Sequence, residues 1–268
     1  MNQRTNAMFF IKYGPWALVA GASKGIGAAF AENLAARGLN LVLVARNKKD
    51  LTAFGKEIEK KYKVDVVTRV LDLAESKSAD TLAREIKKRE IGLLVYNAAY
   101  SPTGEFLSLG TEDHKKVLST NCRGPLVSVY AAAQQMKKRG RGGIILMSSF
   151  AGMQGGPNFA HYSATKAYNM VLAEGLWFEL KPFGVDVLAC IAGATATPGY
   201  LESVMTAKSR PLIPVMKPEK VAEIALKNLG KKPSVLTGTM NRVAAFFLTR
   251  FMTRKMRVKL MAKAVSKD

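Results

Sequence analysis

The chain has 268 residues, of which 48% are hydrophobic, and a formal net charge of +21 at neutral pH. A chain of this length can bury the core of one large α/β domain without disulfide help. No apolar run approaches the roughly 18 residues that a membrane-spanning helix needs, and the apolar stretch 8–11 is too short for a signal peptide. We therefore expect a protein that is soluble or lies on a membrane surface.

The predicted elements alternate along the chain. Short runs rich in valine, isoleucine and leucine predict buried strands, and the longer segments between them have helical length and period. Strands that alternate with helices favour a parallel sheet covered on both faces. The predicted fold class is therefore α/β, a single doubly wound parallel sheet with helices on both faces. The strands are expected at 16–20, 41–45, 64–71, 92–96, 143–147 and 185–191, and the helices at 26–37, 48–62, 76–89, 112–139 and 162–181.

The domain organisation follows from the same pattern. No repeat, low-complexity segment or linker occurs before about residue 192. Residues 192–218 contain four prolines and predict a loop that could cover a substrate. We expect residues 1–240 to form one domain that includes this loop, followed by a basic C-terminal segment at 241–268. Cys122 and Cys190 match no metal-ligand spacing, so we expect no metal site. We expect both to be buried structural thiols. The low cysteine count fits a reducing, cytoplasmic compartment.

A glycine-rich turn follows the first predicted strand. Glycines at such a place let the backbone approach a pyrophosphate, and the N-terminus of the next helix supplies free N–H groups. The spacing Gly-x-x-x-Gly-x-Gly departs from the commoner Gly-x-Gly-x-x-Gly, and glycine also serves tight turns structurally. Its position after the first strand favours a Rossmann-type dinucleotide site. The turn reads Gly21-Ala22-Ser23-Lys24-Gly25-Ile26-Gly27.

The end of the second predicted strand bears on which dinucleotide binds. Sites selective for NAD usually place an acidic residue there, against the ribose 2′-hydroxyl. Here the strand ends at Val44-Ala45-Arg46. Arg46 and Lys24 could bind a 2′-phosphate by charge-assisted hydrogen bonds, although Arg46 could also simply solvate the strand end. The sequence favours NADP(H).

Tyr162 and Lys166 stand four residues apart at the start of a predicted helix. This spacing places both side chains on one helix face. A tyrosine has an ordinary pKa of about 10, and a neighbouring ammonium group lowers the pKa, which suits an acid/base. The pair also occurs by chance on many helices. We assign the adjacent His161 to packing or to the surface, because Tyr162 already supplies the proton-transfer group.

Together these residues resemble the short-chain dehydrogenase/reductase family over nearly the whole chain, from Trp16 to about Asn241. The resemblance implies that hydride is transferred between a nicotinamide and the substrate carbon that carries the reacting oxygen. The features that carry it are the glycine turn, Asn97-Ala98-Ala99, Asn121, Ser149, Tyr162 and Lys166, which match the family in order and spacing.

The resemblance implies four catalytic residues. Tyr162 would donate a proton to the substrate oxygen, and Ser149 would hydrogen-bond that oxygen. Lys166 would bind the nicotinamide ribose and depress the pKa of Tyr162. Asn121 would anchor a water that passes protons on through Lys166.

The resemblance also implies the cofactor contacts. Asp72 would meet the adenine edge, Asn97 would support the central strand, and the segment that begins at Gly193 would cover the nicotinamide. The full implied set is Gly21, Ser23, Lys24, Gly25, Ile26, Gly27, Arg46, Asp72, Leu73, Asn97, Ala98, Tyr162, Lys166, Gly193, Thr195 and Thr197. The chain departs from the family pattern at Ala20, Ala99 and Ala192, which affects cofactor affinity more than chemistry.

Within the family, Tyr13-Gly14-Pro15-Trp16 and the run 57–62 resemble the branch of very-long-chain 3-ketoacyl-CoA reductases and 17β-hydroxysteroid dehydrogenases. That likeness implies an apolar, lipid-, acyl- or steroid-like ketone or alcohol, and the family implies a homodimer or homotetramer. The alternative is a nicotinamide-binding regulatory or membrane-peripheral interaction protein with little turnover. The intact set of four catalytic residues disfavours that alternative.

The C-terminal segment 241–268 carries eight basic residues against one acid, which is +7 and leaves +14 elsewhere. Its apolar residues recur at three- and four-residue spacing and predict an amphipathic helix. Such a helix could lie on an anionic membrane, close over the substrate or pack against a subunit. No nucleic-acid motif accompanies the charge, so we expect no nucleic-acid partner. The expected apolar stripe is Phe247, Leu248, Phe251, Met252, Met256 and Leu260.

Overall fold

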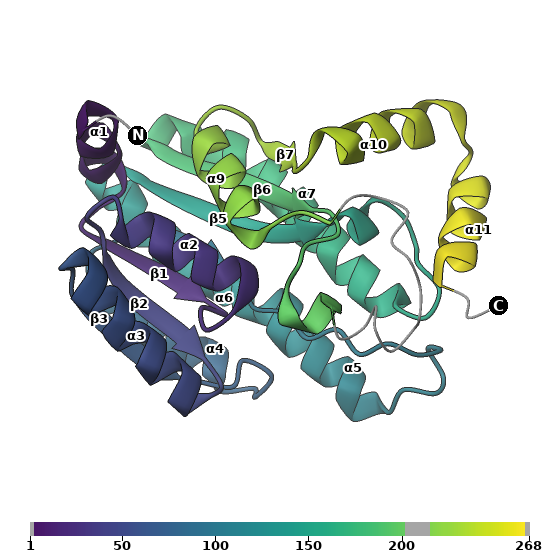
Figure 1. Ribbon diagram of the computed structural model, residues 1–268, viewed down its shortest axis with the longest axis horizontal. Helices are drawn as coiled ribbons and strands as arrows, with labels where there is room; N and C mark the ends of the chain where they lie inside the picture. The colour runs from purple at the N-terminus through teal and green to yellow at the C-terminus, as the bar shows by residue number, and fades with distance from the viewer. Residues whose placement is uncertain (1–2, 202–214, 266–268) are drawn as a thin grey trace.

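The structure is a computed structural model that describes residues 3–201 and 215–265. Its strands are all parallel and form one sheet in the order β3-β2-β1-β4-β5-β6-β7 (Figure 1). The predicted fold class is confirmed. The strands are β1 (Trp16–Ala20), β2 (Asn40–Ala45), β3 (Val66–Val70), β4 (Ile91–Tyr96), β5 (Gly142–Ser149), β6 (Val185–Ala192) and β7 (Ser234–Leu236).

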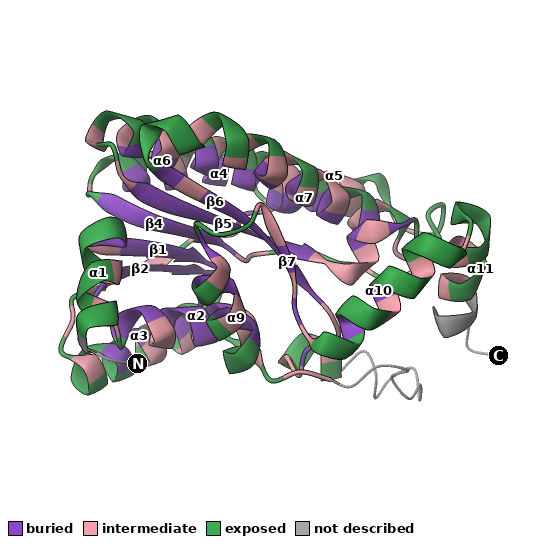
Figure 2. Ribbon diagram, turned by 90° about the horizontal axis from the view of Figure 1, so that it is seen from above, coloured by how far each residue is buried: buried purple, intermediate pink, exposed green. Residues whose placement is uncertain are grey.

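Helices cover both faces of this sheet, as Figure 2 shows in cross-section. Helices α2, α3 and α9 lie on one face, and α4, α6 and α7 on the other. None of the described helices is long and apolar enough to cross a membrane. The helices are α1 (Gln3–Tyr13), α2 (Gly25–Ala35), α3 (Lys48–Tyr62), α4 (Ser78–Lys87), α5 (Thr111–Leu118), α6 (Gly124–Arg139), α7 (Ala160–Leu180), α9 (Pro218–Asn228), α10 (Thr239–Phe251) and α11 (Arg254–Val265), with a π-helix η1 (Ser119–Arg123) and short 3₁₀ turns η2 (Phe150–Met153) and η3 (Lys181–Phe183).

Two hydrophobic cores result from the alternation of side chains along the strands. On β2, Leu41 and Leu43 belong to the core under α2, α3 and α9, whereas Val42 and Val44 belong to the core under α4, α6 and α7. Successive residues of a strand point to opposite faces, so a strand covered on both sides must be apolar throughout. This is why the strands appear in the sequence as uninterrupted apolar runs.

The predicted helix at 112–139 is broken by the π-helix η1, and the cause lies on β4. The hydroxyl of Tyr96 donates to the carbonyl of Thr120 at 2.8 Å, which in a regular helix would accept from Gly124. The Gly124 amide donates to Ser119 instead, five residues back. A Cβ at Gly124 would lie 1.9 Å from the Tyr96 hydroxyl, so glycine is required at this crossing. Single-turn π-bulges of this kind occur frequently at functional sites.

The predicted single helix after residue 241 is wrong, because the chain turns between α10 and α11. Met252 has extended backbone angles, φ −116° and ψ 136°. The hydroxyl of Thr253 then accepts from the amide of Met256 at 3.3 Å, which caps the start of α11. Residues 239–265 therefore form two helices joined at a corner, at the right of Figure 1.

Candidate active site

The glycine turn between β1 and α2 lies at the switch point of the sheet, where β2 and β4 lie on opposite sides of β1. Gly21 has φ +79°, and a Cβ there would lie 2.8 Å from the Ala98 backbone. A Cβ at Gly27 would lie 1.9 Å from the carbonyl oxygen of Gly21. No side chain caps the start of α2, so its first N–H groups remain available to a phosphate. The turn fits a dinucleotide pyrophosphate.

The carboxyl ends of β1 and β4 are joined at this turn. The amides of Asn97 and Ala98 donate to the Ala20 carbonyl at 3.0 and 2.8 Å. The Asn97 side chain donates to the carbonyl of Gly21 at 3.0 Å. Asn97 and Ala98 therefore lie beside the glycine turn, and Asn97 stabilises its shape.

The exposed rim of this site is formed by the ends of β2 and β3. Arg46 is exposed just beyond β2. Lys24 forms an ion pair with Asp50 of α3, with 2.7 Å between the charged atoms. Asp50 therefore places a carboxylate near the rim. The sequence at the end of the second strand did not indicate it, because Asp50 lies four residues after Arg46. Asp72 is half-buried and accepts from the amide of Ala74 at 3.0 Å.

The remaining residues of the expected cofactor set lie in the turn, after β3 or after β6. Ser23 and Ile26 are half-buried within the glycine turn, and Leu73 is buried after β3. A Cβ at Gly25 would lie 2.9 Å from the Thr197 side chain, so the segment after β6 lies against the turn. The Thr195 hydroxyl donates to the carbonyl of Gly193 at 2.9 Å.

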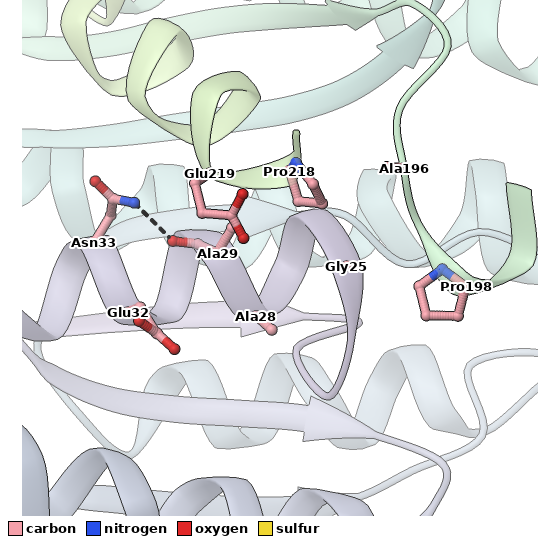
Figure 3. A pocket seen from close by; sticks show the side chains of 9 residues that line it. All are labelled: Gly25, Ala28, Ala29, Glu32, Asn33, Ala196, Pro198, Pro218 and Glu219. Atoms are coloured by element: carbon pink, nitrogen blue, oxygen red, sulfur yellow. Dashed lines mark hydrogen bonds between the residues drawn. The ribbon is translucent and has the colours of Figure 1, made fainter. Parts of the chain in front are cut away.

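The expected loop 192–218 is only partly loop-like. Thr195 forms a parallel bridge with Met216, and residues 198–201 form a helical turn. Residues 202–214 of this expected loop lie outside the described residues. Figure 3 shows a pocket of about 270 Å³ between α2 and the described ends of this segment. It is lined by Gly25, Ala28, Ala29, Glu32, Asn33, Ala196, Pro198, Pro218 and Glu219.

The edge of β5 carries Ser149, beside the first turns of α7. Ser149 is the last residue of β5, and its hydroxyl accepts from the amide of Ala151 at 3.2 Å. One residue earlier, Ser148 donates to the carbonyl of Lys166 at 2.7 Å, which fixes α7 against the strand. The Ser149 hydroxyl lies close enough to the phenol of Tyr162 to act on its pKa. The structure therefore brings Ser149, Tyr162 and Lys166 together.

Burial sets the ionisation of Tyr162 and Lys166. The Lys166 ammonium donates to the carbonyl of Met147 at 3.0 Å and lies 5.5 Å from the centre of the Tyr162 ring. Burial lowers the pKa of Lys166 to about 8, an effect that the electrostatic interaction with Cys122 partly opposes. Burial also raises the pKa of Tyr162, and the neighbouring Ser149 hydroxyl opposes this rise.

The direction expected from the spacing, a lowered pKa for Tyr162, is therefore wrong for this structure. The reason is that the Lys166 ammonium donates to the backbone carbonyl of Met147, while burial of the Tyr162 phenol disfavours its charged form.

Asn121 lies fully buried in the π-helix η1. Its side-chain amide donates to the Tyr100 carbonyl at 2.9 Å and to the Thr165 hydroxyl at 3.1 Å, and its oxygen accepts from the Tyr100 amide at 2.8 Å. Its backbone carbonyl accepts from Asn169 at 3.0 Å. Asn121 thereby connects the segment after β4 to α7, one turn from Tyr162.

The sequence did not single out His114 as the neighbour of His161. The two Nδ1 atoms lie 3.0 Å apart. The rings of both histidines line a small cavity with Tyr162, and His161 is half-buried. Burial lowers the pKa of His161, and the neighbouring His114 adds to the effect. The sequence assigned His161 to packing or to the surface, and that assignment stays a prediction.

The two thiols differ in burial. Cys190 is fully buried in β6, and burial raises its pKa to about 12. Cys122 is half-buried beside Asn121, and burial raises its pKa as well. Both are free, and the described residues contain no cluster of His, Cys, Asp and Glu that could hold a metal ion.

A doubly wound parallel sheet with an uncapped glycine turn at its switch point defines a dinucleotide-binding α/β protein. The family model of short chain dehydrogenases matches residues 15–208. The chain therefore belongs to the short-chain dehydrogenase family, as the sequence predicted, and its members bind a nicotinamide cofactor.

Curated relatives match most of the chain. A 7β-hydroxysteroid dehydrogenase of Clostridium sardiniense is 32% identical over 231 residues, which cover 86% of this chain and 88% of that protein. A very-long-chain 3-oxoacyl-CoA reductase of Neurospora crassa is 32% identical over 235 residues, which cover 86% of this chain and 69% of that protein.

Solved structures of similar fold include members of the same family. A 7β-hydroxysteroid dehydrogenase structure superimposes with a TM-score of 0.87 at 28% identity, over 94% of this chain and 98% of the other. A short-chain dehydrogenase of Sphingobium yanoikuyae in complex with NADPH superimposes with a TM-score of 0.78 at 28% identity, over 88% and 93% of the two chains.

Proposed function

We propose that this chain is an NADP(H)-dependent oxidoreductase that interconverts a ketone and a secondary alcohol on an apolar substrate. The observation that carries the proposal is the joint position of Ser149, Tyr162 and Lys166 at the carboxyl edge of β5. Lys166 is buried and its ammonium lies 5.5 Å from the centre of the Tyr162 ring, and Ser149 and Tyr162 are half-buried beside it. The glycine turn lies at the carboxyl end of β1, on the same edge of the parallel sheet. A substrate held between them would meet both proton donor and cofactor.

Tyr162 is the proposed proton donor for the substrate oxygen. A phenol whose pKa is raised by burial keeps its proton at neutral pH, as reduction of a ketone requires. Ser149 hydrogen-bonds the same oxygen and orients it. When bound, the reduced nicotinamide supplies the hydride.

Lys166 and Asn121 complete the proposed set. With a pKa of about 8, Lys166 is mostly an ammonium at pH 7 and can donate to a ribose hydroxyl. Asn121 holds Tyr100 and Thr165 in place beside Tyr162, and in our proposal its helix turn anchors a water that exchanges protons with Lys166.

NADP(H) is the proposed cofactor because Arg46 is exposed at the end of β2, where a 2′-phosphate would lie. Lys24 would join it by leaving Asp50, since an exposed ion pair holds it only weakly. The other proposed contacts are the glycine turn, Asp72, Leu73, Asn97, Ala98, Gly193, Thr195 and Thr197.

Cofactor choice can be tested with Arg46→Asp. The variant should lose roughly tenfold or more in NADPH affinity, since a hydrogen bond to a charged group contributes about 1.5–3 kcal/mol. Its NADH affinity should change less. Lys60→Asp, the same charge change at the far end of α3, is the matched control. Equal losses for both cofactors with Arg46→Asp would contradict a 2′-phosphate contact.

The proposed substrate class is steroid- or long-chain acyl-like, because the relatives named above act on hydroxysteroids and very-long-chain 3-oxoacyl-CoA. We further propose a homodimer or homotetramer through α6 and α7. Their outer faces expose large apolar side chains that include Tyr130 (67% exposed) and Phe178 (75% exposed). Such residues outside an interface would form an unusual apolar surface.

We propose a cytoplasmic, membrane-peripheral location, with residues 1–240 performing the reaction and residues 241–268 making the surface contact. An apolar substrate partitions into membranes, and two free thiols suit a reducing compartment.

The reaction is tested by following NADPH oxidation against ketosteroids, 3-ketoacyl thioesters and a small polar ketone. We expect turnover with the large apolar ketones and little with the small one. Absence of turnover with every ketone, while NADPH still binds, would favour a nicotinamide-binding protein without catalysis.

A further inference from the structure

Helices α10 and α11 form an arm, residues 239–265, that extends away from the sheet (Figure 1). Most of its surface is exposed in Figure 2. The arm approaches the body near its start, at Asn241, and again within α11, at Val258. A Cβ on Gly193 would lie 2.1 Å from the side-chain nitrogen of Asn241, and a Cβ on Gly155 would lie 3.9 Å from Val258. The arm therefore connects the end of β6 to the segment between Ser149 and Tyr162.

Helix α10 has two faces that differ in burial. Asn241 and Ala245 are buried against the body, and Leu248 is half-buried on the same side. The opposite side presents large apolar residues that repeat at intervals of three and four, which is the spacing of a single helix face. These are Met240 (59% exposed), Val243 (46%), Phe247 (55%) and Phe251 (68%).

Three phenylalanines of this helix form one exposed aromatic cluster. The ring centres of Phe247 and Phe251 lie 5.7 Å apart, and Phe246 lies 5.6 and 6.3 Å from them. An exposed apolar patch of this kind on an otherwise charged protein marks an interaction surface. The side chains of this patch are aromatic and aliphatic, and none of them is a carboxylate.

Basic side chains surround the cluster. Residues 239–265 contain no aspartate or glutamate. Within the described part of the chain, no carboxylate lies within ion-pair distance of a basic residue of the arm. The exposed basic residues there are Arg242, Arg250, Arg254, Lys255 and Lys259.

We propose that the arm binds an anionic lipid surface, with Phe246, Phe247 and Phe251 inserted among the acyl chains and the basic residues against the headgroups. An apolar face flanked by unpaired cations fits this partner. A second copy of the chain fits less well, because two arms placed face to face would bring like charges together.

The inference rests on the membrane-peripheral location proposed above and gives it a specific surface. Since Val258 of the arm lies beside Gly155, in the segment that leads to Tyr162, a membrane bound by the arm would lie near that segment, where an apolar substrate could enter. The surface itself requires no turnover, so lipid binding and catalysis can be measured separately.

Vesicle co-sedimentation of the full chain tests the proposal. We expect binding to phosphatidylcholine vesicles that contain phosphatidylglycerol, little binding to phosphatidylcholine alone, and weaker binding as salt is raised. The double variant Arg250→Gln, Arg254→Gln should weaken binding by about 25-fold, at about fivefold for each basic residue. The variant Phe247→Ser, Phe251→Ser should weaken it by at least about tenfold.

Matched variants on α3, far from the arm, supply the control. Lys56→Gln with Lys60→Gln removes the same charge and should leave binding within about twofold, since α3 lies on the opposite side of the molecule from the arm in Figure 1. Circular dichroism and NADPH binding of each variant check that the fold is retained. Unchanged binding in both arm variants would overturn the proposal, as would equal binding to neutral vesicles.

The second-copy alternative gives a different result. If Phe247→Ser with Phe251→Ser lowers the oligomeric state in sedimentation velocity while vesicle binding is absent in the unaltered protein, the arm is a subunit contact and the proposal is wrong. Loss of vesicle binding with full ketone reduction would separate this inference from the proposed function.

Discussion

Two regions of the molecule, the proposed catalytic cluster and the C-terminal arm, use their polar and apolar groups in opposite ways. The proposed catalytic cluster, called the Tyr162 cluster below, consists of Asn121, Ser149, Tyr162 and Lys166. In the Tyr162 cluster a lysine and an asparagine are buried, and their polar atoms are hydrogen-bonded to the protein. In the arm, phenylalanines are exposed and arginines have no carboxylate partner among the described residues.

The contrast indicates a different role for each region. Burying a charged group disfavours its ionised form, so the Tyr162 cluster carries a stability cost that suits proton transfer. Exposing large apolar side chains costs little in the folded chain itself, but it creates a surface that a partner can cover. In our proposals, the first region holds its groups for a reaction, and the second presents its groups to a membrane.

The largest expected effect is on the pH dependence of stability through Lys166. Lowering the pKa of a buried amine from 10.5 to about 8 corresponds to about 3 kcal/mol. Between these values the unfolded chain binds more protons than the folded one, so the free energy of unfolding must rise with pH. Relative to Lys166→Met, the unaltered protein should gain about 3 kcal/mol between pH 7 and about pH 10.5 in urea unfolding. If the free energies of unfolding of the unaltered protein and of Lys166→Met change with pH in parallel, Lys166 is not held in a desolvated site.

A smaller effect is expected for Asn121→Ala. The variant leaves the amide and carbonyl of Tyr100 without their partner, and we expect a loss of about 2–3 kcal/mol in the free energy of unfolding. Asn228→Ala is the matched control, because that side chain makes one local hydrogen bond to Ile224. If the two variants lose equal stability, Asn121 does not connect the β4 edge to α7 as described.

The smallest effect is expected in the arm. Phe247→Ser should change the free energy of unfolding by less than about 0.5 kcal/mol, as for other exposed positions. Phe30→Ala, in the core under α2, should cost about 3–5 kcal/mol. Both are measured by thermal or urea unfolding. A large loss for Phe247→Ser would mean that the arm packs against protein, in the same chain or in a second copy.

The sequence was sufficient for the sheet because each strand is buried on both faces and therefore apolar throughout. It also predicted Ser149, Tyr162 and Lys166, which stand at a strand end and on consecutive turns of one helix. The short β7 was missed, since three residues of an edge strand carry no periodic signal. The π-helix η1 was missed because its cause, the hydroxyl of Tyr96, lies on another element.

Long-range contacts explain the remaining differences. The pairing of Lys24 with Asp50 and of His114 with His161 depends on how separate elements pack. The pKa of Tyr162 was predicted in the wrong direction because spacing on a helix reports proximity to Lys166 but not removal from water. In the arm, a continuous three-four spacing could not reveal that the helix ends at Phe251 and a new one starts at Arg254.

Replacing Tyr162 by phenylalanine tests the central claim most directly. The substitution keeps the ring beside Lys166 and removes only the phenolic hydroxyl. NADPH binding, followed by fluorescence, should stay within about twofold, and ketone reduction should fall by about 10²- to 10⁴-fold, the usual contribution of a positioned acid. Near-normal turnover in Tyr162→Phe would contradict the assignment of Tyr162 as the proton donor.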